Sequence, residues 1–376
     1  MAHPLQNILD TVSGVFSKKN ESVVGIDVGS AFLKVVQLKK RGGKAVLETY
    51  GEIALGPYAG VAVGQATNLS AEKIAEAIKD LFREANVTGK KTALSIPLGS
   101  TLLSLMEMPV LSDKELARMI PIEARKYIPV PISEVTMDWW IVPKETAGHG
   151  APIDTKENEP RKIEVLVVAV HNEVIGKYKT ISAVSGFNNP VYELEVFATS
   201  RSSFGARGFP TMIVDMGAAT TKLAIVEYGI IRSQHIINNG GQNITLSIAQ
   251  SLGVSIERAE DLKRATGLAG ISGEEKSATD AALLTLEHIF SEANRVLLNY
   301  ERKNGKAIRN VVLTGGGALL KGLHDFVGRR VETDVSFADP FAKVEAPAFL
   351  APVLRDAGPE FSVAIGLSLR MLEELA

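Results

Sequence analysis

Three residue types that suit a phosphate and its magnesium ion recur twice in this chain at one spacing. Each copy reads as an apolar strand ending at Asp, a tight turn built on Gly, and a second apolar strand containing Lys. Each residue of the second copy lies 188 positions after its counterpart: Asp27 and Asp215, Gly29 and Gly217, Lys34 and Lys222. A duplicated hairpin of this kind predicts two related domains that face one nucleotide.

The chemistry expected at each turn follows from its residues. The two glycines lack a Cβ atom, so backbone N–H groups can approach a phosphate closely. Ser30 and Thr220 can add hydroxyl donors beside them. Both aspartates close their first strands, where carboxylates can hold the water shell of Mg²⁺. A single Asp-x-Gly would indicate an ordinary hairpin turn, but two copies in register favour a nucleotide site.

A third element has the pattern of a glycine turn against a nucleoside. The run 311–320 reads as a strand, the glycines Gly315, Gly316 and Gly317, and a helix. Bare backbone just before a helix favours anions, and bulky side chains there would block an adenine or its phosphates. The chain contains no G-x-x-x-x-G-K-[ST] sequence, which excludes a P-loop NTPase. It also lacks a complete G-x-G-x-x-G/A dinucleotide fingerprint.

Composition excludes several classes of protein. The 376 residues suffice for two domains with their own cores. A formal net charge of −2 gives no electrostatic case for nucleic acid. The absence of cysteine excludes disulfides and thiolate metal sites, and the six histidines are scattered. No apolar run reaches the roughly 20 residues that span a bilayer, and the N-terminus lacks a signal-peptide pattern, so we expect a cytoplasmic location.

The order of predicted elements repeats together with the hairpins. In both copies three strands precede a helix, which indicates duplication. The expected elements are strands 23–29, 32–39 and 45–54 with a helix at 70–85, and strands 211–216, 221–228 and 230–237 with a helix at 242–252.

A different module separates the copies, and further elements follow the second one. We expect helices at 112–127 and 171–186 in the module, a polar connection at 145–161, a helical stretch at 255–303, a Pro- and Ala-rich connector at 338–360 and a last helix at 362–375. The predicted division is an amphipathic arm (1–19), a first domain (20–91), an inserted subdomain (92–187), a crossover (188–210), a second domain (211–340), and a connector with the C-terminal helix (341–376).

The arm has one apolar helical face. That face is formed by Leu5, Ile8, Leu9, Val12 and Phe16. It could lie on a membrane surface, dock on a partner, or pack on its own protein.

The inserted module contains a Pro-rich segment that could bind a peptide. Pro129 and Pro131 fix the backbone and remove two N–H donors, so the segment should be a rigid edge and not a central strand. Apolar neighbours such as Tyr127 and Ile128 could form one wall of a groove for an extended peptide. Alternatively, these side chains cap the core of the module itself.

Together these motifs resemble the actin-like ATPase superfamily. The expected fold class is therefore α/β: an actin-like (ribonuclease H-like) duplicated two-domain fold with an inserted α+β subdomain. Within the superfamily the chain is most similar to the PilM family of type IV pilus assembly proteins. The segments that carry this likeness are 122–135, with its Tyr-Ile-Pro-Val-Pro run, and 358–370. The module favours PilM over MreB and actin, and the acidic end of the chain favours it over FtsA.

The resemblance implies roles for individual residues. Asp27, Gly29, Ser30 and Lys34 match the first phosphate loop, and Asp215, Gly217 and Thr220 match the second. The turn 315–317 matches the adenosine turn. The charged residues Glu260, Lys263 and Arg264 resemble the helix beside ribose and adenine, although a solvated helix face would have the same pattern. Glu195 aligns with the group that orients the attacking water, so Glu195 and Asp215 are the expected catalytic residues.

The resemblance also implies a function and partners. We expect an ATP- and Mg²⁺-binding scaffold, with slow hydrolysis an open question, at the cytoplasmic face of the inner membrane. Its expected partners are the cytoplasmic N-terminal tail of a PilN-like protein, which Arg125, Tyr127, Ile128, Pro129 and Pro131 would contact, and other pilus platform or motor proteins. Membrane association would be indirect or through the arm. The alternatives are an FtsA- or MreB-like filament protein and a small-molecule kinase of the same fold.

Overall fold

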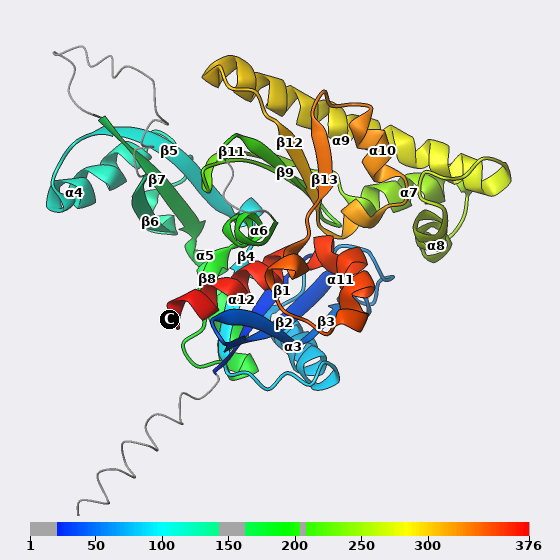
Figure 1. Cartoon of the computed structure of the whole chain (residues 1–376), viewed down its shortest axis with the longest axis horizontal. Coiled ribbons are helices and arrows are strands. Elements are labelled where there is room, and N and C mark those ends of the chain that lie inside the picture. The colour runs from blue at the N-terminus through cyan, green and yellow to red at the C-terminus, as the bar shows by residue number, and fades with distance from the viewer. Residues whose placement is uncertain (1–20, 143–161, 204–207, 376) are drawn as a thin grey trace, which may run out of the picture.

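The chain folds into two lobes with a small module beside them. The computed structural model describes residues 21–142, 162–203 and 208–375. In Figure 1 the second lobe lies above the first, and the small module projects to one side of both. The arm 1–19 and the polar loop 145–161 lie outside the described residues.

The first lobe is built on a five-stranded mixed sheet. Its strands are β1 (Ser22–Val28), β2 (Phe32–Arg41), β3 (Lys44–Ala54), β4 (Lys91–Ile96) and β8 (Val191–Leu194), in the order β3-β2-β1-β4-β8. Side chains alternate between its faces. Val24 and Ile26 pack toward α3 (Ala71–Glu84) and α5 (Asn172–Ser185), whereas Val23 packs toward the C-terminal helix α12 (Ser362–Glu374). Both faces are therefore covered by helices.

The second lobe repeats this plan. Its strands are β9 (Thr211–Met216), β10 (Thr221–Glu227), β11 (Ile230–Ile237), β12 (Asn310–Thr314) and β13 (Asp334–Phe337), in the order β11-β10-β9-β12-β13. In each sheet the three consecutive strands are antiparallel and the two later strands are parallel to the first of them. This identity of order and direction confirms the predicted duplicated fold.

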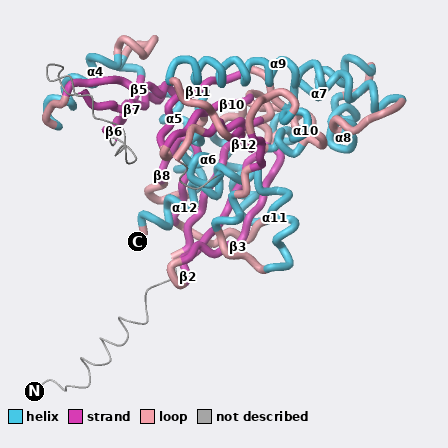
Figure 2. Tube along the Cα trace, turned by 45° about the horizontal axis from the view of Figure 1, so that its top comes forward, coloured by secondary structure: helices cyan, strands magenta, loops and turns pink. Residues whose placement is uncertain are grey.

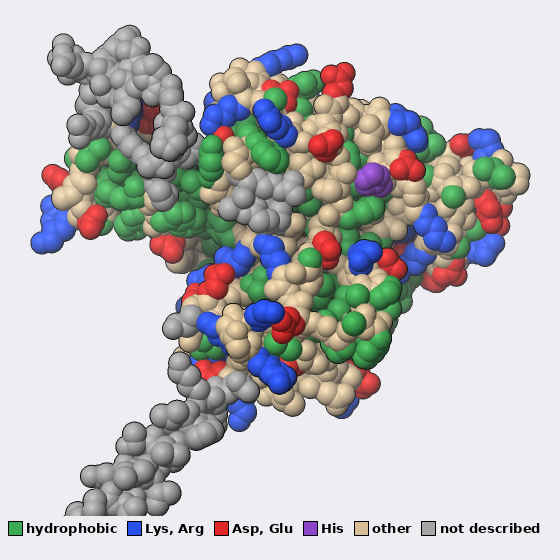
Figure 3. Space-filling view, viewed as in Figure 1, with side chains coloured by type: hydrophobic (Ala, Val, Ile, Leu, Met, Phe, Trp, Pro, Cys, Tyr) green, Lys and Arg blue, Asp and Glu red, His purple; other side chains and the backbone are tan. Residues whose placement is uncertain are grey.

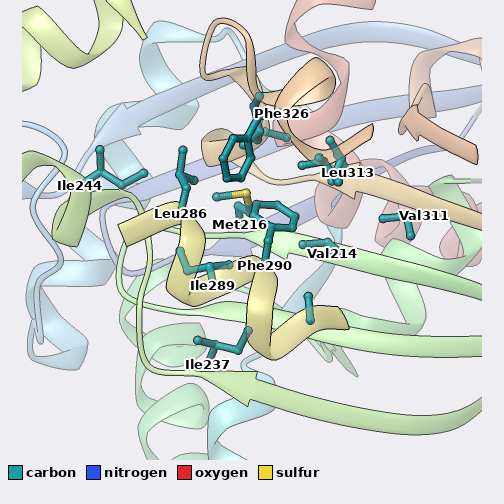
Figure 4. Packing of buried hydrophobic residues seen from close by; sticks show 14 of the residues in the cluster. Val214, Met216, Ile237, Ile244, Leu286, Ile289, Phe290, Val311, Leu313 and Phe326 are labelled. Atoms are coloured by element: carbon teal, nitrogen blue, oxygen red, sulfur yellow. The ribbon is translucent and has the colours of Figure 1, made fainter. Parts of the chain in front are cut away.

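Helices of the second lobe cover its sheet on the outer side. Figure 2 shows the long helix α9 (Gly273–Asn304) running along the sheet, with α7 (Gly241–Leu252) and α8 (Ile256–Thr266) near one end. The predicted helical stretch 255–303 is thus two helices. Between α9 and the sheet, Phe290 and Phe326 pack edge to face, with ring centroids 5.9 Å apart, beside Met216 (Figure 4). This core fixes the end of β9, where Asp215 lies.

The small module is a three-stranded antiparallel sheet with one helix. Its strands are β5 (Thr101–Pro109), β6 (Val135–Val142) and β7 (Lys162–His171), in the order β5-β7-β6, and its helix is α4 (Asp113–Ala124). A capping box starts α4, since the Ser112 N–H donates to Glu115 Oε2 at 2.9 Å. The helix ends earlier than the expected 127. Among the described residues, β6 pairs with β7 alone and is an edge strand.

The expected connector at 338–360 is in fact structured. It forms short helical turns, namely η4 (Pro340–Lys343), η5 (Ala348–Leu350), α11 (Ala351–Ala357) and η6 (Gly358–Phe361). Phe341, Leu354 and Phe361 are buried against α12. Prolines occupy a first helical position in η4, α11 and η6. From composition alone, the same prolines suggest a linker.

The helix α12 packs unusually close to α6 (Glu195–Ser203). A Cβ atom on Gly366 would overlap the carbonyl oxygen of Ala198. We therefore expect Gly366→Ala to lower the free energy of unfolding by roughly 1–3 kcal/mol, as overpacking does. Gly176→Ala is the matched control, because Gly176 is also helical but has no atom within 4 Å of an added Cβ. It should be neutral or stabilising by up to about 1 kcal/mol. Urea denaturation of both variants checks this, and equal midpoints would contradict the close packing.

Among the described residues, no helix combines the length and apolar character that crossing a bilayer requires.

Candidate functional site

A cavity of about 370 Å³ lies between the two lobes. Both Asp-Gly hairpins, the glycine turn and helix α8 contribute to its walls. The structure brings together in this cavity every residue of the predicted nucleotide and catalytic sets: Asp27, Gly29, Ser30, Lys34, Glu195, Asp215, Gly217, Thr220, Glu260, Lys263, Arg264, Gly315, Gly316 and Gly317. A volume of this size suits a small-molecule ligand.

The two hairpin turns have the same geometry. The Gly29 N–H donates to the carbonyl of Phe32 at 3.1 Å, and the Gly217 N–H donates to that of Thr220 at 3.0 Å. A Cβ atom on Gly29 would lie 2.6 Å from that same Phe32 oxygen. The geometry of the turn therefore requires glycine, whether or not a ligand approaches it.

The two aspartates are held by different partners. Ser95 Oγ donates to Asp27 Oδ1 at 3.0 Å and itself accepts from the Val28 N–H at 3.0 Å. Burial raises the pKa of Asp27, against the opposing effect of Lys34 and Lys222. Asp215 lies opposite Lys222 in the sheet, with its Oδ2 3.6 Å from the ammonium nitrogen.

Lys222 joins two carboxylates in the cavity. Its Nζ lies 2.7 Å from Glu195 Oε2, and Glu195 Oε1 accepts from the Leu98 N–H at 2.6 Å. Burial raises the pKa of Glu195 despite these partners, and although burial lowers the pKa of Lys222, the carboxylates of Glu195 and Asp215 raise it by more. Lys222 was absent from the predicted nucleotide set, although the repeat contains it in register with Lys34.

Glu195 lies at the junction between a strand and a helix. Strand β8 ends at Leu194, and Glu195 is the first residue of α6. The alternation of apolar residues across 193–198 resembles a strand, but the fold ends that strand at the cavity. Its side chain is buried, with partners on both carboxylate oxygens.

The glycine turn opens a single 3₁₀ turn (Gly316–Leu319) and not the expected longer helix. Gly315 has a φ of +80°, and a Cβ there would overlap Asp215 Oδ1. A Cβ on Gly317 would lie 2.7 Å from the Met216 side chain. At Gly316 the nearest atom is Glu360 Oε2, 3.7 Å away. Gly315 and Gly317 thus allow close packing of the chain on β9, and Gly316 is the exposed glycine of the three.

Glu260 and Lys263 of α8 face the cavity wall and not the solvent, whereas Arg264 is exposed. Glu260 is buried, and its carboxylate contacts Lys263 Nζ at 2.6 Å and Arg264 Nε at 2.7 Å. Burial opposes ionisation of Glu260, but Lys263, Thr245 and Arg264 together lower its pKa. Lys263 Nζ also donates to Thr245 Oγ1 at 2.8 Å.

Two contacts of this helix region reach the first lobe. The Arg264 guanidinium lies over the Phe32 ring, 5.7 Å from its centroid. The Ala66 N–H donates to Gln242 Oε1 at 3.1 Å. The lobes therefore contact each other through α8 and through α7.

Other residues that line the cavity were not predicted from the sequence, among them Phe32, Glu52 and Glu360. Lys34 Nζ lies 3.8 Å from Glu52 Oε2, which faces it across β2 and β3. Burial raises the pKa of Glu360. A register argument for the hairpin could have found Glu52, but Glu360 comes from the segment that was expected to be a connector.

The donor set fits a hydrated divalent cation. Six carboxylates and four cationic side chains line the cavity, so it has a formal excess of negative charge. Within the part of the chain that the structure describes, no group of three or more Asp, Glu or His side chains is placed to hold a metal alone. Mg²⁺ commonly binds through one or two carboxylates, waters and ligand phosphates. Asp27 and Asp215 can supply the carboxylates.

The predicted peptide-binding residues differ in their exposure. Tyr127 is 50% exposed, and Arg125, Pro129 and Pro131 are also exposed. Ile128 is 7% exposed and packs in the core of the small module. The alternative, that these residues cap the module core, therefore holds for Ile128 and not for Tyr127.

The duplicated sheets, the two facing hairpins and the glycine turn define an actin-like ATPase fold. The chain belongs to the family described as type IV pilus assembly protein PilM, whose model matches residues 25–372. This confirms the resemblance expected from the sequence.

Several known proteins resemble this chain at low sequence identity. A curated relative, the cell division protein FtsA of Neisseria meningitidis serogroup B, is 24% identical over 352 residues, covering 83% of this chain and 81% of that protein. The solved PilM–PilN type IV pilus biogenesis complex matches with a TM-score of 0.77 and 23% identity, covering 93% of this chain and 98% of the other. The ethanolamine utilization protein EutJ from Carboxydothermus hydrogenoformans matches with a TM-score of 0.53 and 16% identity, covering 93% and 89%.

Proposed function

We propose that this protein is an ATP-binding scaffold of type IV pilus assembly, located at the cytoplasmic face of the inner membrane, which binds the N-terminal tail of a PilN-like protein. The observation that carries the proposal is the single cavity lined by both Asp-Gly hairpins and the glycine turn. In this reading ATP lies between the lobes with its phosphates at the hairpins and its adenosine at the glycine turn and α8.

The charges of the cavity support a magnesium complex of ATP. A triphosphate would enter a cavity that already has more carboxylates than cations. A divalent cation between Asp27, Asp215 and the phosphates would offset this repulsion, because opposite charges attract strongly where water is excluded. The hydroxyls of Ser30 and Thr220 and the backbone of both turns would donate to the remaining phosphate oxygens.

Hydrolysis, where it occurs, would be an in-line attack of water on the terminal phosphate. Such reactions depend on positioning and on electrostatic stabilisation. Glu195 is the carboxylate available to orient the water, but Lys222 holds one of its oxygens and the Leu98 N–H the other. Hydrolysis therefore requires that Lys222 first release Glu195, and we expect a slow reaction.

Exposed apolar side chains on the small module support a peptide partner. Figure 3 shows hydrophobic side chains covering much of the visible face of this module. Its exposed large apolar residues include Met119, Ile122, Tyr127, Trp140 and Ile141. Trp140 also packs edge to face on Phe197 of α6, with centroids 5.2 Å apart, which joins the module to the first lobe. An extended tail could lie there, and the partner named in the PilM–PilN structure makes a PilN-like tail the first candidate.

The double variant Arg125→Glu with Tyr127→Ala tests the partner site. We expect it to weaken binding of a synthetic PilN-like tail peptide by about tenfold, because it removes an aromatic anchor and reverses a charge at the binding surface. ATP affinity should be unchanged, since neither residue lines the cavity. Fluorescence anisotropy of a labelled tail, with and without Mg·ATP, measures both effects.

The matched control is Phe349→Ala with Arg355→Glu, which makes the same kinds of change at exposed positions near α11. It should leave the affinity for the tail as in the unmodified protein. If both double variants bind the tail equally well, the tail lies elsewhere. If the unmodified protein captures no tail in either nucleotide state, the proposed partner is wrong.

A further inference from the structure

Lys222 links the two lobes inside the cavity. It lies on β10 of the second sheet, whereas Glu195 opens α6 directly after β8 of the first sheet. Their 2.7 Å contact is an ion pair between side chains that are 20% and 8% exposed. Breaking such a buried pair leaves an uncompensated charge, so it restrains the two lobes relative to each other.

The corresponding lysine of the first hairpin, Lys34, pairs within its own lobe. Lys34 lies opposite Asp27 as Lys222 lies opposite Asp215. Its nearest carboxylate is Glu52 at 3.8 Å, on the adjacent strand of the same sheet. Both hairpins therefore contain the lysine, but among the described residues only its second copy forms an ion pair between the lobes.

Of the two partners, the lysine is the one that can move. Glu195 is fixed on the first-lobe side, because its other oxygen accepts from the Leu98 backbone. Lys222 has a flexible stem of four carbons, and its ammonium lines the same cavity as Gly217 and Thr220 of the second turn. A phosphate at this turn would compete with Glu195 for the ammonium.

We propose that Lys222 senses the terminal phosphate of the nucleotide and transmits its presence to the lobe contact. Without that phosphate Lys222 holds Glu195 across the lobes. A terminal phosphate has more charge and more acceptor oxygens than one carboxylate, so it replaces Glu195 as the partner of the Lys222 ammonium. The lobes lose their ion pair only in the triphosphate state, and Glu195 is then free to orient water. This inference rests on the proposed nucleotide site.

Separate affinities for ATP and ADP test the proposal. In calorimetry at fixed Mg²⁺ concentration, Lys222→Met should lower ATP affinity by about tenfold or more, as the loss of one charge-assisted hydrogen bond does. The affinity for ADP should change by less than about twofold, because ADP lacks the phosphate that Lys222 would contact. Lys263→Met is the control with the same chemical change, and it should weaken both nucleotides to a similar extent because Lys263 belongs to α8.

Glu195→Gln gives an effect of the opposite sign. It removes the competitor for Lys222 and should raise ATP affinity while leaving ADP affinity unchanged, which a merely structural ion pair would not do. Should Lys222→Met prove unstable in a thermal melt, the double variant Lys222→Met with Glu195→Gln leaves no unpaired Glu195 charge and should show the same loss of preference for ATP.

The outcomes separate this inference from the proposed function. If the unmodified protein binds neither nucleotide, both fail. If it binds ATP and ADP, but the ratio of the two affinities is the same in Lys222→Met, only the role of Lys222 as a sensor fails.

Discussion

Asp215→Ala should abolish the magnesium dependence of ATP binding. Asp215 closes β9 at the cavity and is one of the two carboxylates that both hairpins place at the same strand end. With it removed, a hydrated Mg²⁺ would be held by Asp27 alone. We expect calorimetry to show a loss of about 10- to 100-fold in affinity for Mg·ATP, the range for losing a group that holds a metal through its shell. ATP affinity without Mg²⁺ should be little affected.

The fold should survive this change. Lys222 retains its closer partner Glu195 at 2.7 Å, so no cation is left unpaired. Asp261→Ala is the matched control, because Asp261 is exposed on α8 beside the cavity residues but does not line the cavity. Affinity for Mg·ATP that is equal in the two variants would show that Asp215 does not hold the ion.

The two facing hairpins could be predicted from sequence because their features are local. An apolar strand, a glycine turn and a lysine at fixed spacing determine the pairing of Asp27 with Lys34 and of Asp215 with Lys222, which the sheets show. That the copies meet at one cavity followed from duplication, since equivalent strand ends of two related lobes face each other. Strand order then confirmed the fold class.

The partners of the cavity side chains could not be predicted in the same way. Ser95 donates to Asp27 across 68 residues, and Lys222 contacts Glu195, which directly follows a strand of the other sheet. Such pairs depend on how strands and lobes pack, and the spacing of residues along the chain does not reveal them. Glu360 could not be predicted as a cavity residue either. Composition alone assigned its segment to a connector, although Phe341 and Phe361 nearby are buried.

Exposure also divides residues that sequence reasoning grouped together. Tyr127 and Ile128 are neighbours with similar apolar character, but the end of α4 turns one outward and the other into the module core. Glu260 was open to two readings, and its buried contacts with Lys263 and Arg264 favour a role in shaping the cavity over a solvated face. In both cases the sequence pattern identified residues of a suitable type, but tertiary packing determines which groups they contact.

Gly316→Val should block nucleotide binding and leave the fold intact. Gly316 is exposed at the cavity, and only Glu360 Oε2 lies near the position of an added Cβ, at 3.7 Å. A valine there adds three carbon atoms where the adenosine is expected to lie. Overpacking costs roughly 1–3 kcal/mol, so ATP and ADP affinity should each fall by about 5- to 150-fold. Calorimetry with both nucleotides measures the loss.

Gly208→Val is the matched control for this variant. Gly208 is also exposed, and an added Cβ there has a comparable nearest neighbour, Tyr228 Cε1 at 3.8 Å, but the residue does not line the cavity. Both variants should unfold at nearly the temperature of the unmodified protein, because the nearest neighbour of the added Cβ is a side-chain atom at ordinary contact distance in each case. Gly315 cannot serve as the test, since its φ of +80° and its contact with Asp215 mean that any side chain there would also disturb β9. Normal ATP binding by a folded Gly316→Val protein would therefore place the adenosine away from the glycine turn.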